Sequence, residues 1–120
     1  MSREFVEAAI SRMDSPDVPQ RGDIVWASLN PVQGHEQAGH RPHLVLSRRQ
    51  YQDAFGMVVV VPMTHSNRGW PTRVEIEPGS YAICEQPRTI SLGRVTKVES
   101  RGMTDKADQA VEIINRIINF

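Results

Sequence analysis

The chain has very little cysteine. Of its 120 residues only Cys84 is a cysteine, so no intrachain disulfide can form. Cys84 ends the apolar run YAIC, which is typical of a strand, and we expect a buried, unreactive thiol there. The sequence gives no sign of a disulfide-bonded secreted protein, and we expect a cytoplasmic one.

The chain also lacks an excess of charge of either sign and any long apolar run. Fourteen Lys and Arg residues balance 14 Asp and Glu residues, so a site for a polyanion must be a local patch. No apolar run approaches the roughly 20 residues that span a bilayer, and the N-terminal stretch MSREFVEAAISRMD is too charged for a signal peptide. No His, Cys or carboxylate residues have zinc-site spacing, and we expect no metal and no cofactor.

Length and composition fit one domain with one core. We divide the chain into an N-terminal helix and linker, residues 1–20, and a barrel domain, residues 21–120. Apolar residues recur four apart from Phe5 to Met13, as in a short amphipathic helix, and two prolines then end the pattern. So short a helix is not stable alone and must dock on its own barrel, on a second subunit or on a partner. The sequence does not distinguish these.

The rest of the chain predicts a mainly β fold, a small antiparallel barrel followed by a helix. Short strands with turns every 8 to 12 residues are typical of such barrels. We expect five or six strands: near residues 24–30, 43–47, 57–63, 72–76 and 81–86, followed by the stretch PRTISLGRV and a last strand or turn near residues 95–98.

Three further local predictions follow from residue type. The β-branched run MVVVVPM predicts a strand buried on both faces, with Pro62 at an edge or bulge near its end. Residues 48–55 are predicted to be a polar connection. From Thr104, as the N-cap, with Asp105 in the first turn, the apolar positions keep the spacing of a C-terminal helix.

One polar stretch leads directly into an apolar strand, NPVQGHEQAGHRPHLVLS from Asn30 to Ser47. It offers an acceptor, an amide, an imidazole and a fixed cation in Glu36, Gln37, His40 and Arg41. A rigid scaffold commonly holds a functional site at such a position. The alternative is an ordinary solvated loop, and composition alone does not decide between them.

Four blocks resemble one known family. GDIVWASLNPVQGHEQAGHRP, VVVVPMT, GWP and CEQPRTIS occur in the order and at the separations found in MazF/PemK family toxins. The resemblance covers residues 21–118. It implies an SH3-like barrel with a C-terminal helix, a homodimer, and a metal-independent endoribonuclease (mRNA interferase) that cuts single-stranded RNA at short sequences. It also implies a cognate, MazE-like antitoxin whose acidic tail occupies the RNA site.

The resemblance carries site residues onto this sequence. The arginine of the EQ-G-RP block and the threonine after the strand proline, which the family uses for cleavage, are Arg41 and Thr64 here. The glutamate tied to activity is Glu36. The Kid branch uses a histidine, an arginine and an aspartate instead. This chain keeps the first as His35 but has Ile83 and Glu85 at the other two, so Arg41 with Thr64 is the better assignment.

The chemistry fits these residue types. A guanidinium grips two phosphate oxygens at once and a hydroxyl donates to the same oxygens, while the 2′-OH of RNA supplies the nucleophile. The products would be a 2′,3′-cyclic phosphate and a 5′-OH. An arginine is almost never neutral at pH 7, so the general base stays open. The candidates are Glu36, His35, His40 and His65, and for each histidine an ordinary loop role is the stronger interpretation.

RNA binding is expected from side chains that meet unstacked bases and phosphates. These are His35, Gln37, Gln86, Arg88 and Trp70. Trp70 is as well explained as the lid of a small core, and Trp26 is interpreted as core or dimer interface. The other function considered is a non-catalytic binding module of the same barrel, a CcdB-like topoisomerase poison. The C-terminal residues INF do not match the Trp-Gly-Ile tail of that relative.

Overall fold

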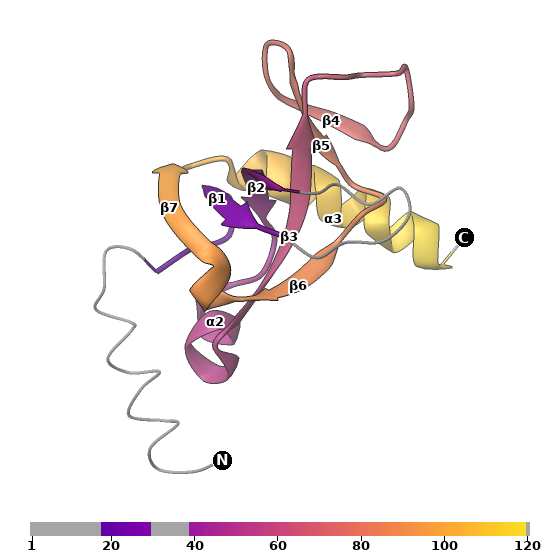
Figure 1. Ribbon diagram of the computed structural model, residues 1–120. Helices are drawn as coiled ribbons and strands as arrows, with labels where there is room; N and C mark the ends of the chain where they lie inside the picture. The colour runs from indigo at the N-terminus through magenta and orange to yellow at the C-terminus, as the bar shows by residue number, and fades with distance from the viewer. Residues whose placement is uncertain (1–17, 30–38, 120) are drawn as a thin grey trace.

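Strand β3 is the strand around which the sheet is arranged. The computed structural model describes residues 18–29 and 39–119 (Figure 1). Its strands are β1 (Ile24–Ser28), β2 (His40–Val45), β3 (Met57–Thr64), β4 (Arg73–Glu77), β5 (Ser80–Ile83), β6 (Arg88–Ser91) and β7 (Val95–Ser100). Its helices are α2 (Arg49–Phe55), the 3-10 turn η1 (Leu92–Arg94) and α3 (Thr104–Asn119). The predicted N-terminal helix lies outside the described residues.

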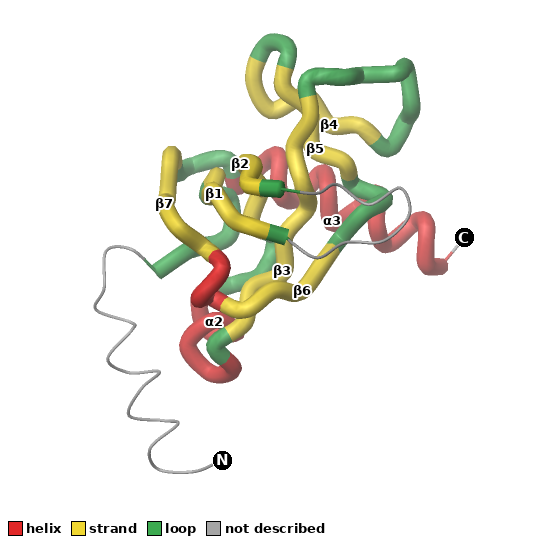
Figure 2. The backbone as a smooth tube through the Cα atoms, in the orientation of Figure 1, coloured by secondary structure: helices red, strands yellow, loops and turns green. Residues whose placement is uncertain are grey.

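The strands form one antiparallel, barrel-like sheet, as predicted. Their order is β4-β5-β3-β2-β1-β7, and β6 pairs with β3 (Figure 2). On one side β3 pairs with β6 as far as Val60 and then with β5 from Met63. Pro62 falls between these two registers, so its missing N–H costs neither ladder a hydrogen bond. Pro62 was expected at an edge or bulge, but it pairs with His43 of β2 without a register shift, and only on the other side of β3 does it fall in the gap between β6 and β5.

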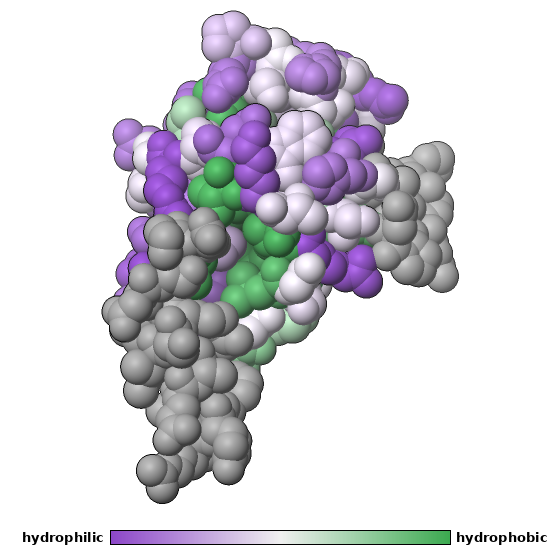
Figure 3. Space-filling model, turned by 60° about the vertical axis from the view of Figure 1, so that its left-hand side comes forward, coloured by the Kyte–Doolittle hydropathy of each residue, from purple (hydrophilic) through white to green (hydrophobic). Residues whose placement is uncertain are grey.

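The core lies on both faces of β3, which confirms the interpretation of MVVVVPM. Val61 and Met63 belong to the cluster that packs under α3, and Val58 and Val60 belong to a second cluster with residues of β1, β2 and β6. Cys84 is fully buried, as expected, and burial raises the pKa of its thiol to about 12. Figure 3, which brings the β7 side forward, shows apolar surface at the centre of that face with hydrophilic side chains around it.

The prediction of a polar connection over residues 48–55 was wrong, because this segment is helix α2. Its polar side chains are not all in solvent: Gln52 and Asp53 are buried. Gln52 Nε2 donates to the carbonyl oxygens of Pro19 (3.1 Å) and Ser47 (3.3 Å), so the amide ties two chain segments together. Gly56 ends the helix at φ 66°, the left-handed conformation that glycine adopts most readily.

Helix α3 is anchored at its first turn. Met103 O accepts from Ala107 N (3.0 Å), so Thr104 is the first helical residue and not the N-cap, while Asp105 does lie in the first turn. Ala107 and Ala110 are buried against the sheet. Gly22 N donates to Val45 O (2.9 Å) and Gly22 O accepts from Met103 N (2.8 Å), which ties the segment before β1 to the start of α3. Within the described ranges, no helix is both long and apolar enough to cross a membrane.

Candidate active site

Arg41 and Thr64 lie on the wall of one cavity. It has a volume of about 560 Å³ and is lined by Trp26, His40, Arg41, Pro42, Met63, Thr64, His65, Ser66 and Ser80. The strand register explains why residues 23 positions apart meet there. β2 and β3 pair His43 with Pro62. Arg41 lies two residues before His43 on β2 and Thr64 two residues after Pro62 on β3, so the antiparallel register sets them opposite each other. The antiparallel ladder thus brings a guanidinium and a hydroxyl to one place.

The guanidinium of Arg41 is held in place by a backbone carbonyl of β3. The side chain is half-buried, and its Nη1 donates to Met63 O at 3.3 Å, the carbonyl immediately before Thr64. Its own carbonyl oxygen accepts from the Nδ1–H of His43 at 2.8 Å. Both the head and the backbone of Arg41 are therefore positioned by neighbours on β2 and β3.

Thr64 is the last residue of β3 and points its hydroxyl toward the loop that follows. The hydroxyl oxygen accepts from Ser66 N at 3.2 Å. A hydroxyl that accepts one bond still has its own proton to donate. Thr64 therefore presents a donor beside the Arg41 guanidinium, an arrangement suited to an anion with several oxygens.

His43 is buried directly behind the cavity wall. It is fully buried, and burial lowers its pKa to about 4, helped by the positive charges of Arg41 and Arg88 and opposed by the hydrogen bond to Arg41 O. The imidazole is neutral at pH 7: Nδ1–H donates to Arg41 O, and the buried Nε2 has no hydrogen-bond partner among the described residues. A histidine held neutral in this way supports the backbone of Arg41 and carries no charge at neutral pH.

Trp26 and His40 form one side of the cavity. Their ring centroids are 5.2 Å apart with planes tilted by 41°. His40 Nε2 lies 2.7 Å from the Thr96 hydroxyl, which itself donates to Trp26 O at 3.3 Å. Trp26, interpreted from the sequence as core or dimer interface, is partly buried and lines this cavity. The signal lay in the hairpin register, which pairs Trp26 with Pro42, next to Arg41.

His65 lies in the bend that follows β3. It follows Thr64 directly, is exposed, and its Nδ1 lies 3.0 Å from Gly79 O, to which only an N–H can donate. The β4–β5 turn therefore fixes the orientation of this imidazole at the cavity.

The other predicted site residues are not brought to this wall. The described residues that line the cavity do not include Gln86, Arg88 or Trp70. Arg88 does lie close enough to lower the pKa of His43. Trp70 is 48% exposed, and two guanidinium groups lie over its ring, with Cζ to centroid distances of 5.7 Å for Arg68 and 5.1 Å for Arg73. Three further residues, His35, Glu36 and Gln37, lie outside the described residues.

The positions that depart from the Kid pattern have structural roles here. Ile83 is fully buried. Glu85 forms an ion pair with Arg73, with 3.2 Å between Oε1 and Nη1. Both belong to the β4–β5 side of the fold and neither lines the cavity of Arg41. In the ranges that the structure describes, no three His, Cys, Asp or Glu side chains are grouped so as to hold a metal ion.

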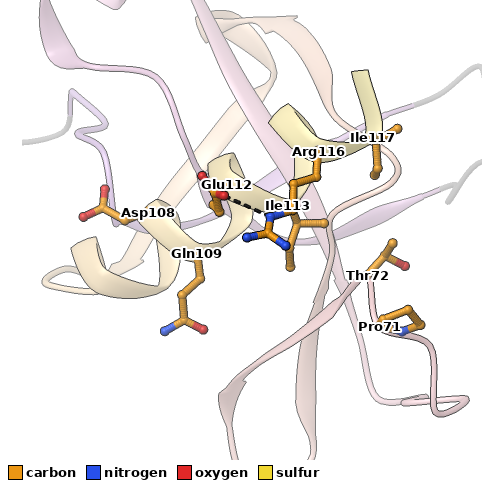
Figure 4. A pocket seen from close by; sticks show the side chains of 8 residues that line it. All are labelled: Pro71, Thr72, Asp108, Gln109, Glu112, Ile113, Arg116 and Ile117. Atoms are coloured by element: carbon orange, nitrogen blue, oxygen red, sulfur yellow. Dashed lines mark hydrogen bonds and ion pairs between the residues drawn. The ribbon is translucent and has the colours of Figure 1, made fainter. Parts of the chain in front are cut away.

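A larger cavity of about 850 Å³ runs along α3. It is lined by Pro71, Thr72, Asp108, Gln109, Glu112, Ile113, Arg116 and Ile117. Figure 4 shows Ile113 and Ile117 on the side of α3 toward Pro71 and Thr72, while Glu112 and Arg116 pair with each other at 3.0 Å. The charge of Arg116, the cationic side chain among the described residues that line this cavity, is thus already neutralised by Glu112 one helical turn away. The smaller cavity, with Arg41 and two histidines, is the better candidate for chemistry on an anion.

Comparison with known proteins agrees with this geometry. The family model described as PemK-like, MazF-like toxin of type II toxin-antitoxin system matches residues 20–118. The endoribonuclease toxin MazF of Escherichia coli (strain K12) is 36% identical over 108 residues, covering 88% of this chain and 92% of the relative.

Two solved structures from Deinococcus radiodurans are similar in fold. MazF (Form-I) has a TM-score of 0.74 at 24% identity and covers 86% of this chain and 98% of that one. MazE-MazF (Form-II) has a TM-score of 0.71 at 25% identity, with 86% and 97% covered. The family match spans nearly all of the described fold, including both strands that carry Arg41 and Thr64. This chain belongs to the PemK-like, MazF-like toxin family of type II toxin-antitoxin systems.

Proposed function

We propose that this toxin is a sequence-specific endoribonuclease that cuts single-stranded RNA by attack of the 2′-OH on the adjacent phosphate, without a metal ion. The observation that carries the proposal is the convergence of Arg41 and Thr64 on one cavity. Relatives that cover most of the chain are named endoribonucleases, which supports the same activity. The products are a 2′,3′-cyclic phosphate and a 5′-OH.

Arg41 and Thr64 act on the phosphate. The guanidinium binds two nonbridging oxygens, and this contact strengthens as negative charge builds on the phosphorane. The Thr64 hydroxyl donates to the same oxygens from the end of β3. Glu36, from the polar segment before β2, assists by positioning Arg41 or by accepting a proton.

The RNA extends from this cavity over neighbouring polar side chains. Gln37 and Gln86 read base edges, because an amide both donates and accepts. Arg88, whose charge already reaches His43, holds a flanking phosphate. His35 and Trp70 contact unstacked bases.

RNA cleavage is tested directly with purified protein. Long single-stranded RNA is incubated with the protein in EDTA, and both the sequences and the chemical ends of the fragments are mapped. We expect cuts at one short sequence, with cyclic phosphate and 5′-OH ends, and no cutting by Arg41→Ala. Cuts at random positions, or cuts that EDTA abolishes, would overturn the proposal.

An antitoxin partner is proposed for the same cavity. A Deinococcus radiodurans relative is described as a MazE-MazF complex, and the polar cavity of this chain carries Arg41 on its wall. An acidic tail of a cognate antitoxin occupies that cavity and excludes RNA. Adding the antitoxin should raise the apparent Kd for RNA in proportion to its concentration, and unchanged RNA affinity in the complex would contradict this model.

We also propose that the toxin acts as a homodimer. Light scattering of the purified protein after size exclusion gives its mass in solution. The expected mass is twice the 13.5 kDa of one chain. A monomer that cuts RNA at full rate would show that one subunit is sufficient.

A further inference from the structure

Among the described residues that line the cavity, the histidines are the side chains suited to accept a proton. Among its described lining residues, the charged or titratable side chains are His40, Arg41 and His65. Arginine stays protonated in proteins, so Arg41 cannot take the proton of a 2′-OH. Imidazole is the side chain that both accepts and donates protons near neutral pH. Two of the chain's four histidines thus stand where the reaction needs a base and an acid.

Each of these imidazoles is anchored through one ring nitrogen. The Thr96 hydroxyl donates to Trp26 O, so it accepts from His40 Nε2–H and leaves the lone pair of His40 on Nδ1. Gly79 O accepts from His65 Nδ1–H, which leaves the lone pair of His65 on Nε2. In both residues the anchor fixes the tautomer and leaves one nitrogen for proton transfer.

The two histidines also flank the phosphate-binding pair. His40 precedes Arg41 on β2, and His65 follows Thr64 at the end of β3. The β2–β3 register that brings Arg41 to Thr64 sets His40 against the residue after the strand, which is His65. His43, on the same strand as His40, is excluded because it is fully buried behind the wall.

We propose that His40 and His65 are the general acid and base pair of RNA cleavage in this toxin, an inference that rests on the proposed function. One neutral imidazole takes the proton of the 2′-OH as the 2′-oxygen forms its bond to phosphorus. The other, as imidazolium, gives its proton to the 5′-oxygen as the P–O5′ bond breaks. After this step the first histidine is an imidazolium and the second a neutral imidazole, and proton exchange with water restores both.

The test uses variants that keep each anchoring hydrogen bond. His40→Gln places an amide N–H near the position of Nε2, and His65→Asn places one near Nδ1. The substrate is an RNA oligonucleotide that carries one mapped cleavage site. We expect each variant to lose on the order of 100-fold or more in kcat, with RNA affinity and thermal unfolding unchanged. An acid and base pair predicts a bell-shaped pH profile of kcat for the parent, and each variant should lack one limb of it.

A second substrate separates acid from base. In a matched oligonucleotide whose 5′-bridging oxygen is replaced by sulfur, the leaving thiolate needs no proton. The variant that lacks the acid should recover nearly full activity on it, and the variant that lacks the base should not. If either variant cuts the oxygen substrate as fast as the parent, or if neither recovers on the sulfur substrate, the pairing is wrong. Failure of the parent itself to cut RNA would instead reject the proposed function.

Discussion

His43 Nδ1–H donates to the carbonyl oxygen of Arg41, two residues earlier on β2, at 2.8 Å. The bond connects a fully buried imidazole to the residue that we place on the phosphate. Because this bond satisfies only Nδ1, a second proton on Nε2 would find no hydrogen-bond acceptor within the part of the chain that the structure describes. Protonation of His43 is therefore opposed by the folded state.

This relationship predicts a loss of stability in acid. The pKa of His43 falls from 6.5 to about 4 on folding, so the folded state binds fewer protons than the unfolded state between these values. The contribution of His43 to the free energy of unfolding is fully present above pH 6.5. It should be lost as the pH drops toward 4, by about 3 kcal/mol in all. Urea unfolding at pH 7 and at pH 4 measures it.

His43→Asn is the matched control, because its amide N–H can donate to Arg41 O but does not titrate in this range. The difference between parent and variant should shrink as the pH falls. Burial raises the pKa of Asp23, whose contribution therefore has the opposite sign, but Asp23 is present in both proteins and cancels in the comparison. Parallel pH curves for the two proteins would contradict the assignment.

Arg41→Lys should be nearly as inactive as Arg41→Ala. Lysine keeps the charge but cannot bind two phosphate oxygens in a planar fork, and it cannot reproduce the contact to Met63 O in the same geometry. We expect both variants to lose on the order of 100-fold or more in kcat. Single-turnover cleavage at saturating protein measures the effect on the chemical step. A lysine variant with a rate close to that of the parent would show that Arg41 acts only through its positive charge.

Thr64→Val and Thr64→Ser separate the hydroxyl from the shape of the side chain. Valine preserves the β-branched form at the end of β3 but removes both the acceptor for Ser66 N and the proton donor. We expect a loss on the order of 100-fold in kcat for valine, and substantial recovery with serine. Equal rates for the two variants would show that the hydroxyl does not act on the phosphate.

Gly22→Ala and Gly102→Ala form a pair that measures the contact between the segment before β1 and the start of α3. Both glycines have a positive φ, 90° and 95°. A Cβ on Gly22 would come within 2.6 Å of Thr104 N, whereas one on Gly102 would meet nothing within 4 Å. Gly102→Ala should cost about 1 to 3 kcal/mol from its backbone alone.

Gly22→Ala should cost a further 1 to 3 kcal/mol or so because the α3 backbone must move. Thermal and urea unfolding of both variants give the difference. If the two alanine variants unfold at the same temperature, the close approach of Gly22 to α3 contributes nothing measurable.

Much of this fold could be predicted from local pattern. Alternation and β-branched runs located the strands, and helical spacing from Thr104 located α3. Helix α2 was missed because Gln52 and Asp53 look solvated in a sequence, and only the carbonyls of Pro19 and Ser47, distant along the chain, explain a buried amide there. Boundaries shifted for the same reason: β2 begins at His40, three residues earlier than predicted, because β1 supplies its partner.

The candidate site divides in the same way. The sequence pointed to Arg41 and Thr64 through their family blocks, and the β2–β3 register accounts for their meeting. The places of Trp26 and His40 depend on Thr96, which lies 56 residues after His40 on β7. No local pattern indicates such a bond. The histidines differ in burial because His43 lies where β2 is buried on both faces, whereas His40, at the start of β2, and His65, just after β3, are exposed.

Strand β3 starts in the packed interior at Val58 and Val60 and ends at Thr64 on the cavity wall. The same strand thus joins the packing of the core to the position of the Thr64 hydroxyl. Substitutions that loosen the interior at Val58 or Val60 are therefore expected to lower catalytic activity as well as stability.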